Sequence, residues 1–447
     1  MSSSYPTLNL PQSLGDGLVM RQAEPGDAAA LADFNQNLHA GAEDPPDGIK
    51  LAILDLASGR HPTTSVADFI LVEDQTAGNK IVSTSCLIPQ TWAYEGLSIP
   101  AGHPEFVGTD PAYRRRGLTR AIFAQLHTLS RAYGHLAQGI LGIPWFYRQF
   151  GYEYALSFGG GRKLDIRAIP DLATGETEPY QIRPATMADL PTLKRLYARH
   201  CQDLLVTSLF DEARWRFILE GNSPGSLAEL HTFCLLNSKA EVIGYYQTQA
   251  YLWGSDLPLF HFMVDQTIAI PDVLPTVLRT LKKHGQALAA KSQGKELQSL
   301  WLRLNLNHPL FVLLDERLGP VKQPYAVYIR VSDLPALLHH LRPVLEERLA
   351  RSALVGYSQT INITFYRGGL QLVFENGQLV QAEPWQDPGD QRPSAGFPPG
   401  TFLQLLFGYR SLAELRYAFP DCWANEASKP LLNILFPKRH SWLVPFG

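Results

Sequence analysis

The sequence predicts a protein that is α/β over its first two domains and α+β over a third. Its 447 residues suffice for about three domains of roughly 150 residues each. Hydrophobic residues make up 45% of the chain and charged residues 18%, a balance typical of globular proteins. A weak internal repeat indicates that the first two domains are copies of one unit, and a change of pattern near residue 334 indicates a third.

The internal repeat joins residues 20–34 to residues 182–196. Arg, Ala, Asp and Leu recur at the same offset in the two segments. Each copy reads as a strand, a short turn and a helix with an acidic first turn and apolar residues at helical spacing. A polar stretch bounded by prolines, residues 170–179, separates the copies and is a predicted linker. We therefore expect one domain over residues 1–168 and its copy over residues 180–334.

A different pattern begins after residue 334. A helical spacing of leucines leads into two alternating strands, at residues 361–365 and 370–374. Each strand is followed by a pair of residues suited to a tight hairpin turn, where φ must be positive: Gly368–Gly369 and Asn376–Gly377. These features predict a separate α+β domain over residues 335–447.

Charge and hydropathy narrow the possible partners. Lys and Arg total 39 against 42 for Asp and Glu, a formal charge of -3, so there is no basic excess to neutralise a phosphate backbone and we expect no nucleic-acid partner. The first residues lack the basic and apolar regions of a signal peptide, and no apolar run approaches the roughly 18 residues that span a bilayer. We expect no membrane association and a cytoplasmic location.

Cysteine usage predicts neither a disulfide framework nor a metal site. The four cysteines are far apart and form no C-x-x-C pair or His-containing ligand spacing: Cys86, Cys201, Cys234 and Cys422. Cys86 lies in an apolar strand pattern, where a buried small hydrophobe is more common than a nucleophile.

Residues 105–120 carry the pattern most suggestive of chemistry. They read as a strand, a turn with Pro111 and an Arg-Gly loop, and apolar residues at helical spacing follow. A glycine at a helix start allows close backbone approach, and the free amides and positive dipole there attract an anion, to which arginines add charge-assisted hydrogen bonds. The segment predicts either a pyrophosphate cradle or a solvated arginine cluster that happens to precede a helix.

The same segment resembles motif A of the GNAT acyltransferases, in which R-x-x-G-x-[GA] follows a strand. Arg114 and Gly117 are in register, whereas Thr119 is larger than the usual Gly or Ala. The resemblance implies acetyl-CoA as co-substrate and no metal. It implies that the strand backbone pairs with the pantetheine arm through Val107, Gly108 and Thr109. It further implies that the pyrophosphate is held mostly by the backbone amides of Arg115, Arg116, Gly117, Leu118, Thr119 and Arg120.

Tyr147 is the candidate general acid. It lies in residues 141–152, whose Y-x-x-F-G-Y pattern resembles the GNAT region where a tyrosine stands beside the thioester sulfur. A CoA thiolate has a pKa of about 8 to 9, so a phenol with a pKa of about 10 can supply its proton without being ionised at neutral pH. The alternative is an aromatic side chain packed between loop and helix, which is the role expected for Phe150 and Tyr152.

Two tandem GNAT domains followed by a small α+β domain resemble the Eis (enhanced intracellular survival) family over essentially the whole chain. The resemblance implies an active first GNAT domain, a degenerate second one and a third domain with a sterol-carrier-like fold. At the repeat offset, residues 276–279 stand opposite the Arg-Gly loop and contain no glycine, as expected of a structural copy. The resemblance also implies an amine acceptor of aminoglycoside, polyamine or lysine type and a homo-oligomer, in this family commonly a hexamer.

The C-terminal carboxylate is the candidate general base. Members of the family place it in the active site, where it takes a proton from the acceptor amine, which is mostly protonated at neutral pH. The apolar tail over residues 441–447 is typical of a docked end rather than a frayed one. Here Gly447 follows Phe446, whereas the family tends to finish on the aromatic residue.

Two other readings stay open from the sequence. The acidic loop over residues 41–47, preceded by His39, either attracts a cationic acceptor or is a solvated turn. The chain itself is either an acetyltransferase that transfers the acetyl group directly or a binding protein whose third domain holds an apolar ligand.

Overall fold

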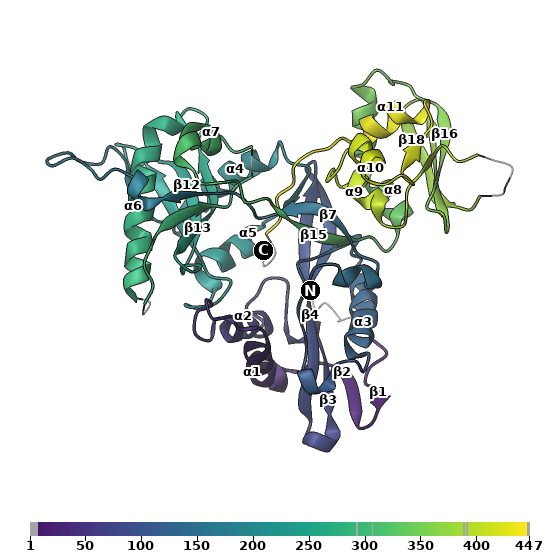
Figure 1. The fold of residues 1–447 in the computed structure, drawn as a ribbon, viewed down its shortest axis with the longest axis horizontal. Coiled ribbons are helices and arrows are strands. Elements are labelled where there is room, and N and C mark those ends of the chain that lie inside the picture. Colours follow the sequence, from purple (N-terminus) through teal and green to yellow (C-terminus); the bar gives the residue numbers. More distant parts are fainter. Residues whose placement is uncertain (1–7, 292–293, 306, 388, 390–391, 445–447) are drawn as a thin grey trace.

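The computed structural model describes residues 8–291, 294–305, 307–387, 389 and 392–444. Their strands form three sheets, and helices pack on the faces of these sheets (Figure 1). The predicted fold class, α/β followed by α+β, is confirmed. Within these ranges, no helix combines the length and the apolar character needed to cross a membrane.

The first sheet has nine strands and contains the first copy of the repeat. α1 (Ala28–His39) and α2 (Gly48–Ala57) cover one face, and α3 (Leu118–Ala132) covers the other (Figure 1). In spatial order its strands are β1 (Gln12–Gly15), β2 (Leu18–Gln22), β3 (Phe69–Asp74), β4 (Lys80–Tyr94), β5 (Leu97–Thr109), β6 (Ala137–Ile140), β15 (Tyr325–Arg330) and β7 (Glu153–Phe158), with β10 (Val206–Ser208) beside the end of β4.

The second sheet has six strands and contains the second copy. α6 (Ile270–Lys291) and α7 (Leu310–Leu314) share one buried cluster with this sheet, whereas α4 (Leu190–Cys201) and α5 (Glu212–Arg216) belong to another. In spatial order its strands are β8 (Arg162–Asp165), β14 (Ser299–Leu302), β13 (Asp256–Val264), β12 (Val242–Gln249), β11 (Leu230–Leu236) and β9 (Gln181–Pro184).

The first two sheets exchange strands. β15 comes after the second copy in the chain but pairs with β6 and β7 of the first sheet, while β8 precedes the second copy and pairs with β14. The chain crosses from β7 to β8 through Gly159, Gly160 and Gly161, all at positive φ. A Cβ on Gly161 would lie 1.9 Å from the Leu302 carbonyl oxygen, so only glycine fits that crossing. Sheet membership therefore runs across the predicted limits at residues 168 and 334.

The residues that define the repeat make the same contact in both copies. Arg21 donates two hydrogen bonds to the Asp27 carboxylate, at 2.7 and 2.9 Å, and Arg183 does the same to Asp189, at 2.7 and 2.8 Å. Each aspartate also accepts a backbone amide three residues before it, in a capping box. A bidentate ion pair between strand and helix start explains why Arg and Asp recur at a fixed offset.

One predicted equivalence between the copies is wrong. Residues 276–279 lie inside α6, so they are not the counterpart of the Arg-Gly loop. The hairpin of β12 and β13 is shorter than that of β4 and β5, which shifts the alignment. The true counterpart, between β13 and α6, is residues 265–269, and it also lacks glycine.

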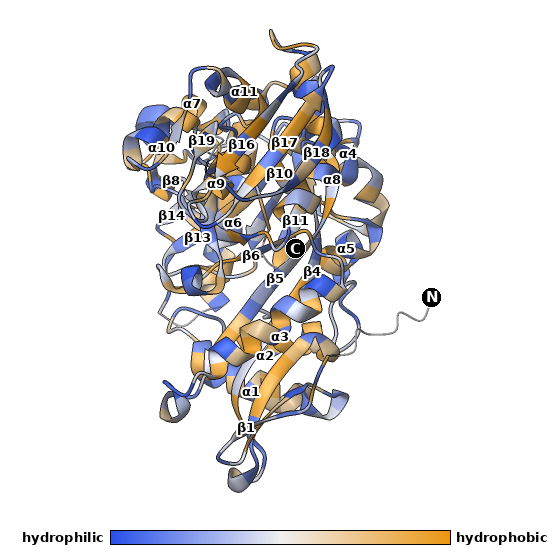
Figure 2. Cartoon of the chain, turned by 90° about the vertical axis from the view of Figure 1, so that its right-hand side faces the viewer, coloured by the Kyte–Doolittle hydropathy of each residue, from blue (hydrophilic) through white to orange (hydrophobic). Residues whose placement is uncertain are grey.

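The third sheet completes the α+β part. Figure 2 shows apolar colouring along β16 and β17, which lie next to each other in this sheet. The predicted Asn376–Gly377 turn is confirmed, because both residues have positive φ between paired strands. The elements are α8 (Leu334–Ala350), β16 (Gln359–Thr364), β17 (Gly369–Glu375), β18 (Gln378–Trp385), β19 (Ala395–Gly396), α9 (Thr401–Leu406), α10 (Leu412–Ala418), β20 (Trp423–Ala424) and α11 (Ser428–Leu435).

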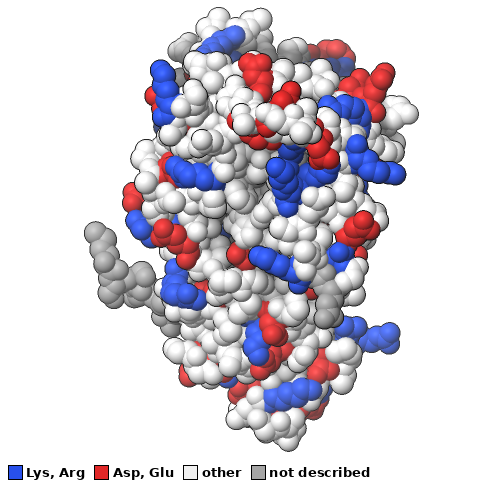
Figure 3. Space-filling model, turned by 90° about the vertical axis from the view of Figure 1, so that its left-hand side faces the viewer, with Lys and Arg blue, Asp and Glu red and all other residues white. Residues whose placement is uncertain are grey.

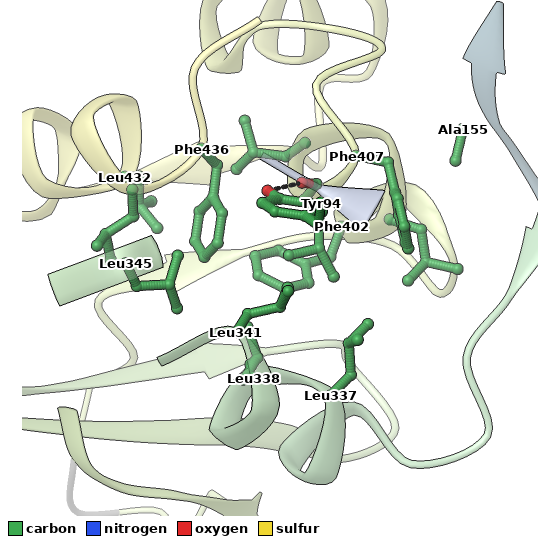
Figure 4. Close-up of a cluster of buried hydrophobic side chains, with 14 of the residues drawn as sticks. Tyr94, Ala155, Leu337, Leu338, Leu341, Leu345, Phe402, Phe407, Leu432 and Phe436 are labelled. Carbon is green, nitrogen blue, oxygen red and sulfur yellow. Dashed lines mark hydrogen bonds between the residues drawn. The ribbon is translucent and has the colours of Figure 1, made fainter. Parts of the chain in front are cut away.

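The third domain shares a hydrophobic core with the first sheet. Side chains from α8, α9 and α11 converge on Tyr94, at the end of β4, and its hydroxyl donates a hydrogen bond to the Leu406 carbonyl oxygen at 2.7 Å (Figure 4). Phe402, Phe407 and Phe436 belong to the same cluster. The reading of the chain as an apolar-ligand binding protein finds no support in this packing.

Candidate active site

The first sheet opens between β5 and β6. These parallel strands pair only at Ala101 with Ala137 and at Gly102 with Gln138. Beyond Gly102, the edge of β5 facing β6 has no strand partner in the described structure. An open edge offers backbone N–H and C=O groups to an extended ligand in the manner of an added strand.

The predicted pantetheine residues lie on this open part of β5. A bulge precedes them, where Phe106 has a φ of 52° and the register with β4 shifts. Val107 packs with the aromatic cluster around Tyr147. A Cβ on Gly108 would lie 2.3 Å from the Leu38 side chain, so α1 approaches the backbone here as only glycine allows.

The predicted pyrophosphate loop leads into α3. Gly117, with a φ of 76°, precedes the first helical residue, Leu118, and Arg115 also has a positive φ, of 65°. The backbone amides of residues 115–120 donate no hydrogen bond to any other described residue. Four of these amides are the free donors of a helix start, where the helix dipole is positive. The loop can therefore receive an anion through its backbone.

The arginine side chains of this loop are exposed and only loosely held. Arg116 forms an ion pair with Asp16 at 2.9 Å, and Arg120 donates to the Gln149 side chain at 2.8 Å. Exposed pairs of this kind contribute little to stability, so both guanidinium groups can turn toward a ligand at small cost.

Thr119 fits the motif in spite of its size. Its hydroxyl lies 3.2 Å from the Thr109 hydroxyl, which lies 2.7 Å from that of Ser83. The hydroxyl therefore bonds toward the end of β5 and does not block the amides of the loop.

Tyr147 lies in a short 3-10 turn over Phe146–Phe150 and shares a packing cluster with Val107 of the open part of β5. Its side chain is 4% exposed and packs against Phe123 and Tyr328. The hydroxyl makes no hydrogen bond within the described residues. Burial, and secondarily the charge of Glu105, raise the pKa of Tyr147 well above its ordinary value. The phenol thus stays protonated and has a proton to give.

The loop before Tyr147 is held by tyrosines of the exchanged strand. Tyr325 donates to the Gly142 carbonyl oxygen and Tyr328 to that of Ile143, each at 3.2 Å. A Cβ on Gly142 would lie 2.2 Å from the Tyr147 ring, so the loop and the ring are in direct contact. Because β15 comes from beyond the second copy, no local pattern near Tyr147 indicated this support.

The sequence reasoning missed Glu105 and His103, and it named His39 only as the residue before the acidic loop, not as a neighbour of Glu105. The Glu105 carboxylate is hydrogen-bonded to His103 Nε2 at 2.8 Å, and its charge acts on both Tyr147 and His39. His39 Nε2 is buried without a partner among the described residues, and burial lowers the pKa of His39. One sequence feature could have indicated this cluster: His103 and Glu105 are polar residues at alternate positions of an otherwise apolar strand, just before the bulge at Phe106.

Cys86 is a buried packing residue, as predicted. It is fully enclosed in β4, between β3 and β5, and burial raises the pKa of its thiol well above the ordinary value. No group of three or more His, Cys, Asp or Glu side chains suited to a metal ion occurs in the parts of the chain that the structure describes.

The C-terminal tail runs along β10. Trp442 donates its amide to the Val206 carbonyl oxygen at 2.7 Å, and Val444 donates to the Ser208 hydroxyl at 2.9 Å. The tail is parallel to β10, which is antiparallel to β4, so it points toward the level where β5 and β6 separate. Gly447 lies outside the described residues.

A cavity of about 810 Å³ lies between the first two domains and the tail. Leu141 of the first domain lines it just before the Tyr147 loop, and Trp442 and Val444 line it from the tail. Glu43 and Asp44, of the acidic loop singled out in the sequence, also line it. Outside the cavity, charged side chains of both signs are interspersed on the face drawn in Figure 3.

Comparison with known proteins identifies the first part of the chain. Residues 27–155 match the family model described as an acetyltransferase (GNAT) domain. No curated protein matches the chain. The match contains β5, the Arg-Gly loop, α3 and Tyr147.

Solved structures share the fold over almost the whole chain. A GCN5-related N-acetyltransferase from Anabaena variabilis has a TM-score of 0.64 at 14% identity and covers 95% of this chain and 99% of its own. A probable N-acyltransferase from Enterococcus faecalis has a TM-score of 0.65 at 14% identity, with coverages of 95% and 97%. Eis1 from Mycobacterium abscessus has a TM-score of 0.60 at 13% identity, with coverages of 95% and 98%. The family match thus supports a GNAT N-acetyltransferase domain over residues 27–155, and the solved structures show that the shared fold extends over almost the whole chain.

Proposed function

We propose that the protein transfers the acetyl group of acetyl-CoA directly to an amine. The observation that carries the proposal is the run of free amides over residues 115–120, at the start of α3 and beside the open edge of β5. These groups suit a diphosphate and an extended pantetheine arm, respectively. Val107, Gly108 and Thr109 would hold the arm, and residues 115–120 the diphosphate.

The chemistry assigned to this chain's residues is the movement of two protons. The amine nitrogen forms a bond to the thioester carbonyl carbon, and the bond from that carbon to sulfur breaks. Tyr147 gives its proton to the departing sulfur as the carbon–sulfur bond breaks, and its raised pKa means that the phenol is protonated at neutral pH before that step. A carboxylate takes the proton that the amine loses. Acetyl-CoA supplies only the activated acetyl group.

The general base is assigned to the carboxylate of Gly447. The direction of the tail along β10, toward the opening of the sheet, supports this role. Glu105 is the second candidate, because its charge acts on Tyr147 and it lies on the strand that borders the opening. An extension of the chain beyond Gly447 separates the two candidates, since it moves the terminal carboxylate and leaves Glu105 in place.

The remaining features follow the resemblance to the Eis family. We infer that residues 1–168 form the catalytic domain, that residues 180–334 form a structural copy and that residues 335–447 form a sterol-carrier-like domain. A cytoplasmic homo-oligomer, a hexamer as is common in that family, belongs to the same proposal. The acceptor class is an amine of aminoglycoside, polyamine or lysine type.

The test is thiol release from acetyl-CoA in the presence of polyamines, aminoglycosides and lysine peptides. We expect release with at least one acceptor, and its loss when a few residues extend the chain past Gly447. Full activity of the extended protein would indicate that Glu105, and not the terminal carboxylate, is the general base. The Glu105→Gln variant should then have a much lower turnover. Binding of acetyl-CoA without release, whatever the amine, would refute the enzyme function.

A further inference from the structure

The cavity between the first two domains contains two buried arginines without a carboxylate partner. Arg214 and Arg303 both line it, and each is 8% exposed. Neither forms an ion pair with a carboxylate of the described residues. Arg214 is hydrogen-bonded to His61, whereas the Arg303 guanidinium makes no hydrogen bond to the described protein, and its Nε is fully enclosed. A buried charge in a folded protein is ordinarily paired or hydrogen-bonded.

Aromatic rings surround Arg303 but do not satisfy it. The guanidinium carbon lies 4.6 Å from the ring centre of Trp253 and 4.7 Å from that of Trp301, and within 6 Å of two phenylalanine rings. Rings stabilise the faces of a guanidinium through cation–π contacts. Its five N–H groups lie at the edge and need oxygen or nitrogen acceptors, which rings do not offer. The edge donors of Arg303 therefore remain available to a ligand.

The backbone is shaped to admit Arg303 at this place. A Cβ on Gly159 would lie 2.4 Å from Arg303 Nη2, and Gly159 has a φ of 64°, so the crossing chain leaves room for the guanidinium. Burial lowers the pKa of Arg303 to about 10, so the side chain keeps its positive charge at neutral pH.

The other charges of the cavity do not neutralise Arg303. Asp256 is already bound by Lys163 at 2.5 Å and by the Ser299 hydroxyl. Glu43 and Asp44 come from the acidic loop of the first domain, and Glu43 is exposed. The cavity therefore offers carboxylates from the loop and buried cations from the second domain, an arrangement that suits a ligand with charges of both signs.

We propose that the acetyl acceptor is a primary amine that also carries an anionic group, a carboxylate or a phosphate, and that Arg303 binds this group. Arg214 adds a second positive charge in the same cavity. The inference rests on the proposed N-acetyl transfer and names its acceptor class. It disfavours a polycationic aminoglycoside, which has no group for Arg303 and which both arginines repel.

The test compares matched acceptors. ω-Amino acids of three to seven methylene groups, their carboxamides and the ω-aminoalkyl phosphates are assayed by thiol release from acetyl-CoA. We expect at least one acid or phosphate to exceed its neutral counterpart by at least about tenfold in kcat/KM. Arg303→Gln should bring the ratio close to one, Arg303→Lys should retain part of it, and Arg351→Gln, an exposed residue of the third domain, should leave it unchanged. The better of the acids and the phosphates identifies the anion.

Binding measurements separate this proposal from the proposed function. The N-acetylated acids and phosphates are titrated into the full-length protein by calorimetry, with and without the Arg303→Gln change. Binding that depends on Arg303, without turnover of any amine, would uphold the anion site and refute acetyl transfer. Equal turnover of acids and carboxamides would refute the anion site and leave acetyl transfer standing. Probes that bind only a variant ending at Val444 would show that the chain's own carboxylate occupies Arg303, which also refutes the proposal.

Discussion

The two copies of the repeat begin alike and differ at the loop before the long helix. In the first copy, the amides of residues 115–120 make no hydrogen bond to the described protein. In the second, Asp265 accepts the Thr267 amide on its side chain and the Ile268 amide on its carbonyl oxygen, and Arg195 binds its carboxylate at 2.6 Å. The comparison teaches that both copies keep the ion pair, whereas only the first leaves the backbone donors before its long helix unsatisfied, as an anion site would require.

The sheets differ in the same sense. β13 and β14 pair at four successive positions, from Asp256 with Ser299 to Leu259 with Leu302, whereas β5 and β6 pair at two. β13 and β14 therefore stay paired over a longer stretch than β5 and β6, although β13 also continues beyond the pairing, from residue 260 to Val264.

The largest effect is expected from closing the anion site of the first copy. Gly117→Asp places a side chain at a φ of 76° and a negative charge among the free amides, in space that is open at present. We expect the Kd of acetyl-CoA to rise by at least about 1,000-fold, from backbone strain and charge repulsion together. Calorimetric titration measures it. Ala269→Asp, at the counterpart loop, should leave the Kd unchanged, and a comparable loss there would mean that both copies bind the coenzyme.

The next effect concerns Tyr147, the phenol that we propose as the general acid of the first copy. Tyr147→Phe should lower kcat by about 100-fold while the Kd of acetyl-CoA stays within about twofold, because the hydroxyl acts on the departing sulfur. Tyr245→Phe, which removes a buried hydroxyl without a partner in the second sheet, is the matched control and should keep full turnover. Unchanged turnover of Tyr147→Phe would remove the acid role.

The shared ion pair should respond equally in both copies. Asp27→Asn and Asp189→Asn each remove a bidentate pair and a cap, and each should lower the free energy of unfolding by about 2 kcal/mol. The paired arginine lowers the pKa of both aspartates, so their contribution is complete above the unfolded pKa of about 3.9 and is lost as the pH falls through the folded values. Urea titrations between pH 2 and 7 should show a smaller acid loss in the variants. A variant as acid-sensitive as the parent contradicts this linkage.

The smallest effect is expected where the motif departs from its family. Thr119→Ala restores the usual small residue and removes one hydrogen bond to Thr109. Because the Thr119 hydroxyl does not block the amides, we expect the Kd of acetyl-CoA to change by less than about threefold. A strong gain in affinity would mean that Thr119 obstructs the cradle. Direct titration of the variant and of the parent protein with acetyl-CoA measures the two Kd values.

Local patterns made much of the fold predictable. The recurrence of Arg and Asp at one offset marked both copies because the contact it encodes is local, from strand to the next helix. The Asn376–Gly377 turn and the Arg-Gly loop could also be predicted from the sequence, because the geometry of turns and helix caps depends on neighbouring residues. Alternating apolar positions indicated the strands for the same reason.

Contacts between distant segments escaped prediction. Nothing near Tyr325 indicates that its strand joins a sheet built from residues 12–158, because pairing partners far apart in sequence leave no periodic signal. The sequence around Arg214 and around Arg303 does not indicate that the two side chains line one cavity, because they meet only in the folded protein. Glu105 was hidden in a strand whose bulge only the structure reveals.

The exchange of β8 and β15 determines when each of the first two sheets can be completed while the chain is being synthesised on the ribosome. The first sheet lacks the strand between β6 and β7 until residues 325–330 have left the exit tunnel, although its other strands all precede β15 in the chain and emerge before it. During that interval two unpaired edges face solvent, which favours chaperone binding or association with other nascent chains. A fragment that stops before Tyr325 would carry the same open edges permanently, so the first domain is not expected to be a separable unit for expression or for recombination with other domains.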